Sequence, residues 1–263
     1  MTRVERYGPW AVVTGATAGL GEEFAKQLAA EGFRVVLVGR RADRLAALRE
    51  HLRTAHGAEA RTLCMDLAQE GAAEALDAAT SDLDVGLLIN NAGFGYMGRF
   101  VQQDPVRLAE MIRLNCQAVM LLAHRFGNRL AARGRGAMVI VSSVAGFQAT
   151  PYMCAYGATK AFDLSLAEGL ANELKRSGVD VMALCPGSTR TEFGQVAQSA
   201  GGGGGMDPRA VVRSAIRALG RRRVVVTGWT NKLAALTNRL FPRRFVVYAC
   251  GLVLRGNVPP DRR

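Results

Sequence analysis

Short continuous runs of apolar residues recur along most of the chain, and stretches with helical spacing separate them. Apolar runs of this length, rich in valine, isoleucine and leucine, are typical of buried strands. The predicted strands are Trp10–Thr14, Phe33–Gly39, Ala60–Met65, Val85–Asn90, Ala137–Val141, Val179–Cys185 and Arg223–Thr227. Strands that alternate with helices favour a parallel sheet, because each crossover helix returns the chain to the same edge.

The stretches between these runs repeat their apolar residues every three or four positions, as an amphipathic helix does. Asp104 followed by Pro105 is typical of a helix start, with Asp at the N-cap and Pro at the first helical position. The predicted helices are Leu20–Ala30, Ala42–His56, Gly71–Thr80, Pro105 to about Arg133, a segment through Tyr156, and Pro208–Leu219. The pattern predicts an α/β fold: a single-domain, Rossmann-like, doubly wound parallel sheet with helices on both faces.

A glycine-rich turn, Thr14-Gly15-Ala16-Thr17-Ala18-Gly19-Leu20-Gly21, joins the first predicted strand to the first helix. Glycines at such a turn let the backbone bend sharply, approach a phosphate and pack closely against the strand. A glycine triplet is often only a loop, but this one lies between a strand and a helix. We therefore expect Gly15, Thr17, Gly19, Leu20 and Gly21 to bind a dinucleotide.

The end of the second predicted strand bears on which dinucleotide binds. An acid at this point usually binds the ribose 2′-hydroxyl of NAD, and it would repel a 2′-phosphate. Counting from the glycine-rich turn puts Gly39 at that position, and Arg40 and Arg41 follow directly. Arginine can bind a phosphate through paired hydrogen bonds. We expect NADP(H), with NADPH preferred over NADH; the alternative is that both arginines only cap the loop.

Tyr156 and Lys160 are four residues apart and therefore share one face of a helix. Tyrosine has a pKa of about 10 in water, and a nearby ammonium lowers it by favouring the phenolate. Such a tyrosine can give a proton to a carbonyl oxygen or take one from an alcohol. Ser143, after the strand Ala137–Val141, can orient the same oxygen. Taken alone, the pair also fits a solvated helix face.

The glycine-rich turn, Ser143 and the Tyr156–Lys160 pair, with Asn90-Asn91-Ala92-Gly93 and Asn115 between them, resemble the short-chain dehydrogenase/reductase family. The resemblance covers roughly residues 8–195. It implies hydride transfer between a carbonyl and its alcohol, with Tyr156 as proton donor or acceptor. It also implies that Asn115 is catalytic and holds a water linked to the lysine. A buried helix asparagine is, however, more often a packing residue.

The resemblance also implies cofactor contacts along the carboxyl edge of the sheet. In the family, an Asp-Leu pair meets the adenine, an Asn-Ala-Gly motif contacts the ribose, and a Pro-Gly-x-x-x-Thr motif holds the nicotinamide carboxamide. The matching positions are Asp66, Leu67, Asn91, Ala92, Gly93, Pro186, Gly187, Thr189 and Thr191, together with Tyr156 and Lys160. For Asp66, capping of the next turn is nearly as good an explanation.

The chain further resembles the branch that contains 3-oxoacyl and hydroxysteroid reductases, which implies a small apolar ketone, aldehyde or alcohol as substrate. Steroid-like molecules and acyl thioesters are the candidates, and the family implies a homo-oligomer, a dimer or a tetramer. The rival interpretation is a non-catalytic NADP(H)-binding protein, tethered by its tail to a membrane or an acidic partner. Nucleic acid is not expected, because the arginines of the tail alternate with aliphatic rather than stacking aromatic residues.

The composition suits one soluble domain, with 263 residues, 49% hydrophobic and 21% charged. The five cysteines are odd in number and scattered, and the three histidines form no cluster. We therefore expect reduced thiols, a cytoplasmic location and no metal site. No signal peptide is expected, and the longest late apolar run, Phe245–Leu254, is shorter than the ~20 residues of a membrane span.

The net charge of +12 comes from the end of the chain. Residues 1–205 hold 21 Lys/Arg against 20 Asp/Glu, whereas residues 206–263 hold 13 against 2. We expect a cofactor-binding domain at 1–228 and a basic amphipathic helical extension at 229–263. The extension fits a lid or a subunit contact, which we favour, with reversible peripheral contact to an anionic membrane as a secondary property.

Five consecutive glycines, Gly201 through Gly205, precede this basic region and give the backbone great freedom. In the family, the loop at this point closes over the substrate. The resemblance therefore implies a mobile lid, and a flexible linker is the alternative.

Overall fold

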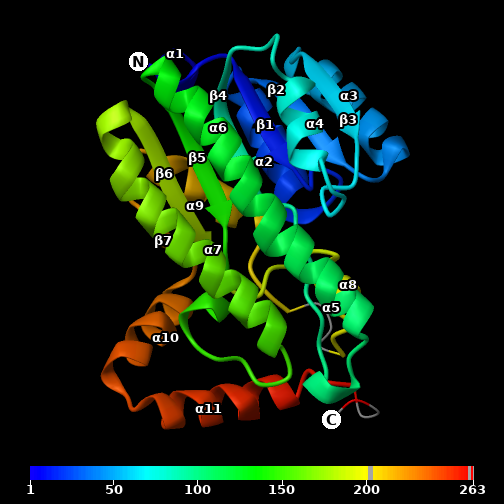
Figure 1. Ribbon diagram of the computed structural model, residues 1–263, viewed down its shortest axis with the longest axis vertical. Coiled ribbons are helices and arrows are strands. Elements are labelled where there is room, and N and C mark those ends of the chain that lie inside the picture. Colours follow the sequence, from blue (N-terminus) through cyan, green and yellow to red (C-terminus); the bar gives the residue numbers. More distant parts are fainter. Residues whose placement is uncertain (201–203, 260–261, 263) are drawn as a thin grey trace.

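Seven parallel strands form the centre of the molecule, in the order β3-β2-β1-β4-β5-β6-β7 (Figure 1). The computed structural model describes residues 1–200, 204–259 and 262. The strands are β1 (Trp10–Thr14), β2 (Arg34–Gly39), β3 (Ala60–Cys64), β4 (Val85–Asn90), β5 (Gly136–Val141), β6 (Val179–Cys185) and β7 (Val224–Val226). The order reverses between β1 and β4, which confirms the predicted doubly wound topology.

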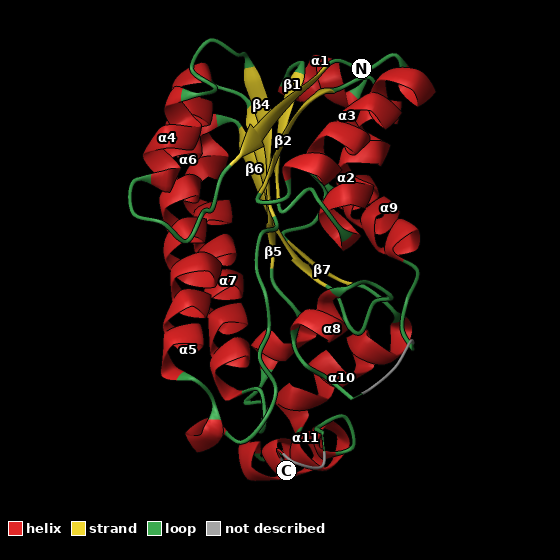
Figure 2. Cartoon of the chain, turned by 90° about the vertical axis from the view of Figure 1, so that its right-hand side faces the viewer, coloured by secondary structure: helices red, strands yellow, loops and turns green. Residues whose placement is uncertain are grey.

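Helices cover both faces of the sheet (Figure 2). One face carries α2 (Gly19–Ala30), α3 (Ala42–His56) and α9 (Pro208–Ala218), and the other α4 (Ala72–Ala78), α6 (Val119–Arg133) and α7 (Cys154–Glu173). Successive side chains of a strand point to opposite faces. In β1, Val12 therefore enters the core beneath α6 and α7, and Val13 enters the core beneath α2 and α3. The sheet thus separates two hydrophobic cores.

The long helix predicted from Pro105 to Arg133 is not one continuous α-helix. It consists of α5 (Pro105–Ile112), a π-helical segment (Arg113–Ala118) and α6. As predicted, the Asp104 carboxylate caps α5 and accepts a hydrogen bond from the backbone N–H of Val106 at 2.9 Å. Hydrophobic spacing does not reveal a π turn, because the turn adds one residue to the hydrogen-bonded ring without changing the buried face. Such turns often lie at functional sites, and this one contains Asn115.

Two further helices, α10 (Trp229–Leu240) and α11 (Arg243–Arg255), lie beyond the carboxyl edge of the sheet (Figure 1). The remaining short elements are α1 (Arg3–Tyr7), α8 (Phe193–Val196) and the 3-10 turns Phe100–Gln102, Val144–Phe147 and Leu174–Ser177. Among the described residues, no helix combines the length and the apolar composition that a membrane span requires.

Candidate active site

The glycine-rich turn closes β1 and opens α2. Gly15 and Gly19 have φ angles of +66° and +59°, which favour glycine. A Cβ at Gly21 would lie 2.2 Å from the carbonyl oxygen of Gly15, so only glycine fits there. The N-cap of α2 is Ala18, whose side chain offers no hydrogen bond. The first N–H groups of α2 can therefore bind an anion, and the turn fits a dinucleotide diphosphate.

Thr14 and Asn91 tie the glycine-rich turn to the end of β4. The Thr14 hydroxyl accepts hydrogen bonds from the backbone N–H groups of Asn91 at 2.9 Å and Ala92 at 3.0 Å. The Asn91 side chain donates to the carbonyl of Thr14 at 2.9 Å. Strands β1 and β4 are the neighbours at which the strand order reverses, and ligands of doubly wound sheets bind at this crevice. Thr14 is not among the cofactor-binding residues predicted from the sequence.

Arg41 is held against the glycine-rich turn. Its guanidinium donates to the hydroxyl of Thr17 at 3.0 Å and to the Thr17 carbonyl at 3.1 Å. Another nitrogen of Arg41 pairs with Glu192 at 3.0 Å, and Arg44 pairs with the second oxygen of Glu192 at 2.6 Å. These two hydrogen bonds hold the pKa of Glu192 below its usual range. Glu192 therefore links the loop after β6 to the arginines that follow β2.

Arg40 lies in a more open position, with 58% of its side chain exposed. Its guanidinium is 3.4 Å from Glu110 of α5 and 3.8 Å from Asp66. A Cβ at Gly39 would lie 2.7 Å from the Thr17 methyl group, so any larger side chain there would displace the Thr17 side chain. Arg40 and Arg41 thus directly follow a glycine at the end of β2.

Asp66 and Leu67 follow β3. The Asp66 carboxylate accepts a hydrogen bond from the backbone N–H of Ala68 at 3.0 Å, so it caps the next turn. Leu67 is buried in the core beneath α4. These contacts give both residues a structural role within the chain. Their contact with adenine stays a prediction.

The loop after β6 folds over the glycine-rich turn. The Thr189 hydroxyl donates to the Gly187 carbonyl at 3.0 Å. Thr191 packs on the turn so closely that a Cβ at Gly19 would lie 3.1 Å from the Thr191 side chain. The loop and the turn are therefore in direct contact.

The glycine run lies at the end of this loop. Residues 201–203 lie outside the described part of the chain. The carbonyl of Gly204 accepts a hydrogen bond from the Ser188 hydroxyl at 3.0 Å, and Thr189 forms a parallel bridge with Met206. The end of the run is thus paired with the loop after β6, and the predicted lid motion stays a prediction.

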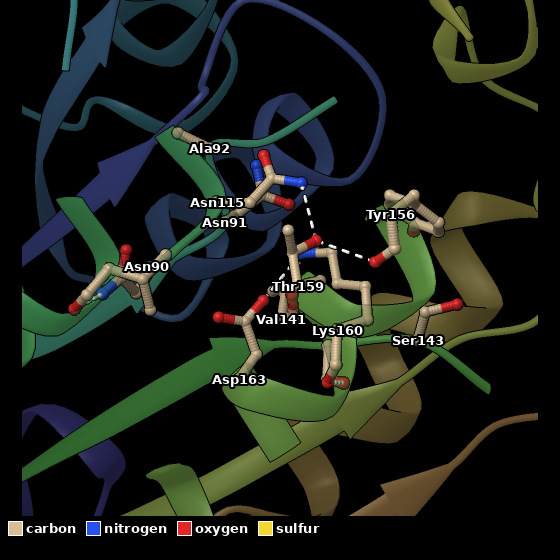
Figure 3. Close-up of polar contacts among 12 residues, drawn as sticks. Asn90, Asn91, Ala92, Asn115, Val141, Ser143, Tyr156, Thr159, Lys160 and Asp163 are labelled. Atoms are coloured by element: carbon tan, nitrogen blue, oxygen red, sulfur yellow. Dashed lines mark hydrogen bonds and ion pairs between the residues drawn. The ribbon is translucent and has the colours of Figure 1, made fainter. Parts of the chain in front are cut away.

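Tyr156 and Lys160 lie on the buried face of α7, and Ser143 follows β5 on the same edge (Figure 3). Their exposed fractions are 7%, 5% and 9%. The Lys160 ammonium donates to the carbonyl of Val141 at 2.8 Å, and the Ser143 hydroxyl donates to the carbonyl of Pro186 at 3.4 Å. The pair is therefore not part of a solvated helix face.

Burial dominates the proton affinity of Tyr156. It raises the pKa of Tyr156, the charge of Lys160 and the hydroxyl of Ser143 lower it, and the net direction is upward. The lysine therefore acts with the expected sign, but it does not outweigh the loss of solvent. Tyr156 keeps its proton near neutral pH, as a donor to a carbonyl oxygen must.

Asn115 connects two parts of the site. Its side-chain nitrogen donates to the carbonyl of Phe94 at 2.9 Å and to the hydroxyl of Thr159 at 3.1 Å, and its oxygen accepts from the N–H of Phe94 at 3.1 Å. Thr159 in turn donates to the carbonyl of Tyr156 at 2.8 Å (Figure 3). Gly93 packs on Asn115, because a Cβ there would lie 3.0 Å from its oxygen. The packing role of Asn115 is evident, and the water relay stays a prediction.

Asp163 is a second residue of the site that is not among those predicted from the sequence. Its carboxylate is 0% exposed and lies 2.9 Å from the Lys160 ammonium. The sequence does contain a signal for Asp163. It is an acid in an apolar stretch, and its spacing of three residues from Lys160 and seven from Tyr156 puts it on the same helix face. Glu192 had no comparable signal, because its partners lie far away in the sequence.

The family model described as short chain dehydrogenase matches residues 9–200. The chain belongs to the short-chain dehydrogenase family. This membership confirms the resemblance drawn from the motifs, and it confirms an oxidoreductase that acts on CH–OH and C=O groups. The Rossmann-like fold of this short-chain dehydrogenase agrees with that assignment.

Two relatives illustrate the branch. This short-chain dehydrogenase is 32% identical over 250 residues to a 7beta-hydroxysteroid dehydrogenase of Clostridium sardiniense, covering 94% of this chain and 96% of the relative. It is 40% identical over 179 residues to a very-long-chain 3-oxoacyl-CoA reductase of Podospora anserina, covering 66% of this chain and 53% of the relative. These are the two kinds of reductase that the motifs resembled.

Solved structures agree on the fold and differ in the bound nucleotide. A 7beta-hydroxysteroid dehydrogenase superposes with a TM-score of 0.88 at 31% identity, covering 95% of this chain and 99% of that one. A short-chain dehydrogenase from Sphingobium yanoikuyae in complex with NADPH gives 0.79 at 35%, covering 88% and 93%. One from Burkholderia phymatum in complex with NAD gives 0.80 at 27%, covering 90% and 93%. The short-chain dehydrogenase family thus binds NAD(P).

Proposed function

We propose that this protein interconverts an apolar ketone or aldehyde and its alcohol with NADP(H). Tyr156 gives or takes the proton, Lys160 lowers the pKa of Tyr156 by its charge, and Ser143 orients the substrate oxygen. The observation that carries the proposal is the convergence of these three buried side chains at the carboxyl edge of the sheet.

The cofactor, when bound, supplies or accepts the hydride. In the direction of reduction, the Tyr156 phenol donates its proton to the oxygen that gains negative charge. Ser143 exchanges its long hydrogen bond to the Pro186 carbonyl for one to the same oxygen. Asn115 holds the loop at Phe94 and, through Thr159, the catalytic helix. The proposal includes the predicted water at Asn115 as the link to Lys160.

Arg40 and Arg41 support NADP(H) as the cofactor. Arg41 donates to Thr17 of the glycine-rich turn, and Arg40, the residue before it, lies by Asp66 and Glu110. The adenosine ribose binds near this turn in doubly wound folds. A 2′-phosphate would compete with Glu192 for Arg41 and with Glu110 and Asp66 for Arg40. The other proposed contacts are those expected from the sequence, from the glycine-rich turn through Asn91 to Thr191.

The side chains around Tyr156 support an apolar substrate. The ring of Phe193 lies 5.4 Å from the ring of Tyr156, centroid to centroid, and Phe94 and Tyr96 are buried in the same hydrophobic cluster as Tyr156. Two classes of carbonyl fit the names of the relatives, a steroid ketone and a 3-oxoacyl thioester. Both present an apolar body of some length beside one reactive carbonyl.

We propose that residues 229–263 form a basic helical extension that meets a second copy of the chain. On α10, Trp229, Leu233, Leu236 and Leu240 follow helical spacing and are each more than half exposed. On α11, Phe245, Tyr248 and Leu252 do the same. The fold of one chain leaves these stripes uncovered, and a subunit in a homo-oligomer would cover them. Anionic lipid, which would also match the charge of the extension, is the secondary partner.

Other parts of the extension support its proposed second role as a lid. The side chain of Asn238 donates to that of Gln148 at 2.6 Å, and the backbone N–H of Ala200 donates to the carbonyl of Asn257 at 2.9 Å. Gln148 lies between Ser143 and Tyr156 in the chain, and Ala200 follows α8. The extension therefore contacts the two loops that border the proposed substrate site. The free thiols of all five cysteines fit the proposed cytoplasmic location.

The test is a screen of NADPH oxidation over ketones, aldehydes, ketosteroids and 3-oxoacyl thioesters. We expect turnover with an apolar carbonyl and a much lower rate with NADH. If the protein binds NADPH, as measured by calorimetry, but reduces none of these carbonyls, the non-catalytic alternative gains the support instead.

A further inference from the structure

Asp163 is an acid in the buried face of the catalytic helix. Tyr156, Lys160 and Asp163 are separated by four and three residues, so they form one stripe along α7. The Asp163 side chain is 0% exposed, and its neighbour along the chain, Leu164, packs in the apolar core. Acids are seldom fully buried unless their charge is paired, so the carboxylate calls for an explanation.

Only one oxygen of this carboxylate is paired. Oδ2 accepts a hydrogen bond from the Lys160 ammonium at 2.9 Å, whereas Oδ1 has no hydrogen-bond partner among the described residues. A buried carboxylate oxygen without a donor is destabilising, and an apolar side chain would avoid that cost. Packing alone therefore does not explain why an acid stands at position 163. The interaction of its negative charge with the Lys160 ammonium does explain it.

The titratable groups around this ion pair come from three elements. Tyr156 lies on α7, Cys116 on the π-helical segment and Cys185 on β6. Burial raises the pKa of Cys116 to about 11 and that of Cys185 to about 12. Both thiols are therefore neutral in the physiological range. Asp163 is the anion that balances Lys160 within the described part of the chain.

We propose that Asp163 is a positioning residue: its carboxylate fixes the Lys160 ammonium and offsets part of the positive charge that Lys160 presents to Tyr156. Asp163 thereby sets the pH range in which Tyr156 exchanges its proton. This inference rests on the proposed function, in which Tyr156 is the proton donor and acceptor.

Burial raises the pKa of Asp163, and the charge and hydrogen bond of Lys160 offset only part of that increase. The charge of Asp163 acts on the pKa of both of its neighbours. Burial by itself lowers the pKa of Lys160, but the charges of Asp163 and Tyr156 more than offset it, so the pKa is raised. Lys160 therefore stays charged. Burial raises the pKa of Tyr156, Lys160 and Ser143 lower it, and Asp163 adds a further increase. While Lys160 stays protonated, removing the charge of Asp163 removes that increase, so Tyr156 ionises at lower pH.

The test compares Asp163→Asn and Asp163→Leu with the wild-type protein. Asn keeps the shape and removes the charge, and Leu fills the buried position without a polar group. We expect both variants to lower the midpoint of Tyr156 ionisation by about one pH unit, the lower end of the effect of a nearby charge. The rise of alcohol oxidation with pH should move to lower pH by the same amount.

The midpoint is measured without turnover, from the absorbance of tyrosinate during an alkaline titration. The same titration of Tyr156→Phe gives the absorbance of the other tyrosines, which is subtracted. Glu173→Gln is the matched control, because it removes one negative charge from the exposed end of the same helix. We expect its midpoint to equal that of the wild type.

An unchanged midpoint in folded Asp163→Asn and Asp163→Leu would overturn the inference. Failure of both variants to fold would overturn it too, because the carboxylate would then be required for folding rather than for proton exchange. The proposed function fails differently: it fails if Tyr156→Phe keeps its catalytic activity, and the titration does not depend on that result.

Discussion

An Arg40→Ala substitution tests whether Arg40 stabilises the fold or selects NADPH over NADH. The Arg40 side chain is 58% exposed, and its two acidic neighbours are 3.4 and 3.8 Å away, so neither contact is a close ion pair. Exposed pairs of this kind contribute ~0.2–1 kcal/mol to stability. The melting temperature of the variant should therefore lie close to that of the wild type.

The effect on NADPH should be much larger than the effect on stability. A hydrogen bond to a charged group contributes about 1.5–3 kcal/mol, and each 1.4 kcal/mol is a factor of ten in affinity. We expect Arg40→Ala to raise the Kd of NADPH roughly ten- to a hundredfold. The Kd of NADH should stay within a factor of about two, because NADH lacks the 2′-phosphate and makes no such bond.

Titration calorimetry with both nucleotides measures these constants directly. Arg49→Ala is the matched control, because Arg49 is an exposed arginine on α3. It should change neither constant. Equal losses of affinity for NADPH and NADH would show that Arg40 only supports the crevice, and an unchanged Kd for NADPH would remove Arg40 from the cofactor site.

Three further predictions test the catalytic residue, the glycine-rich turn and the extension. Tyr156→Phe should lower the reduction rate at least ~10²-fold, the lower end for acid–base catalysis, with NADPH binding retained; near-normal turnover would exclude the assigned role. Gly21→Ala should weaken NADPH binding at least ~10-fold and destabilise the fold by ~1–3 kcal/mol, because its Cβ would meet a backbone oxygen. Gly169→Ala, with open space around its Cβ, should stabilise α7 instead, and a comparable melting temperature for both variants would refute the steric argument. A chain stopped after Thr227 should lose activity or change its oligomeric mass, as measured by light scattering. An active truncated chain of unchanged mass would contradict the subunit and lid roles. Flotation of the full chain with anionic vesicles at low salt tests the secondary membrane contact.

The sequence was sufficient for the sheet and for most of the crevice. Strands β1, β2, β4 and β5 are nearly continuous apolar runs buried on both faces, so a local pattern identifies them. The glycine-rich turn was equally visible, because Gly15 and Gly19 adopt backbone angles that other residues avoid. Arg40 and Arg41 could be placed by counting from that turn. Each of these features depends on a short stretch of chain.

Other features depend on contacts that the sequence does not record. The pairing of Glu192 with Arg41 and Arg44 joins residues about 150 positions apart. The π turn at Asn115 leaves the buried face of the helix unchanged, so its pattern resembles that of one long helix. The exposure of the apolar stripes on α10 and α11 follows from the side of each helix that meets the domain. Burial of Asp163 likewise becomes visible only once α7 is packed on β5.

The separation of the two hydrophobic cores makes the two halves of the protein independent targets for engineering. Leu28 lies on the buried face of α2, which begins at the glycine-rich turn, and Leu164 lies on the buried face of α7, which carries Tyr156 and Lys160. The sheet stands between these side chains, so they share no packing partner, and effects of distant mutations on stability usually add. Stabilising changes selected beneath α2 should therefore combine with those selected beneath α7 without renewed optimisation. A library can treat the nucleotide half and the catalytic half as separate problems.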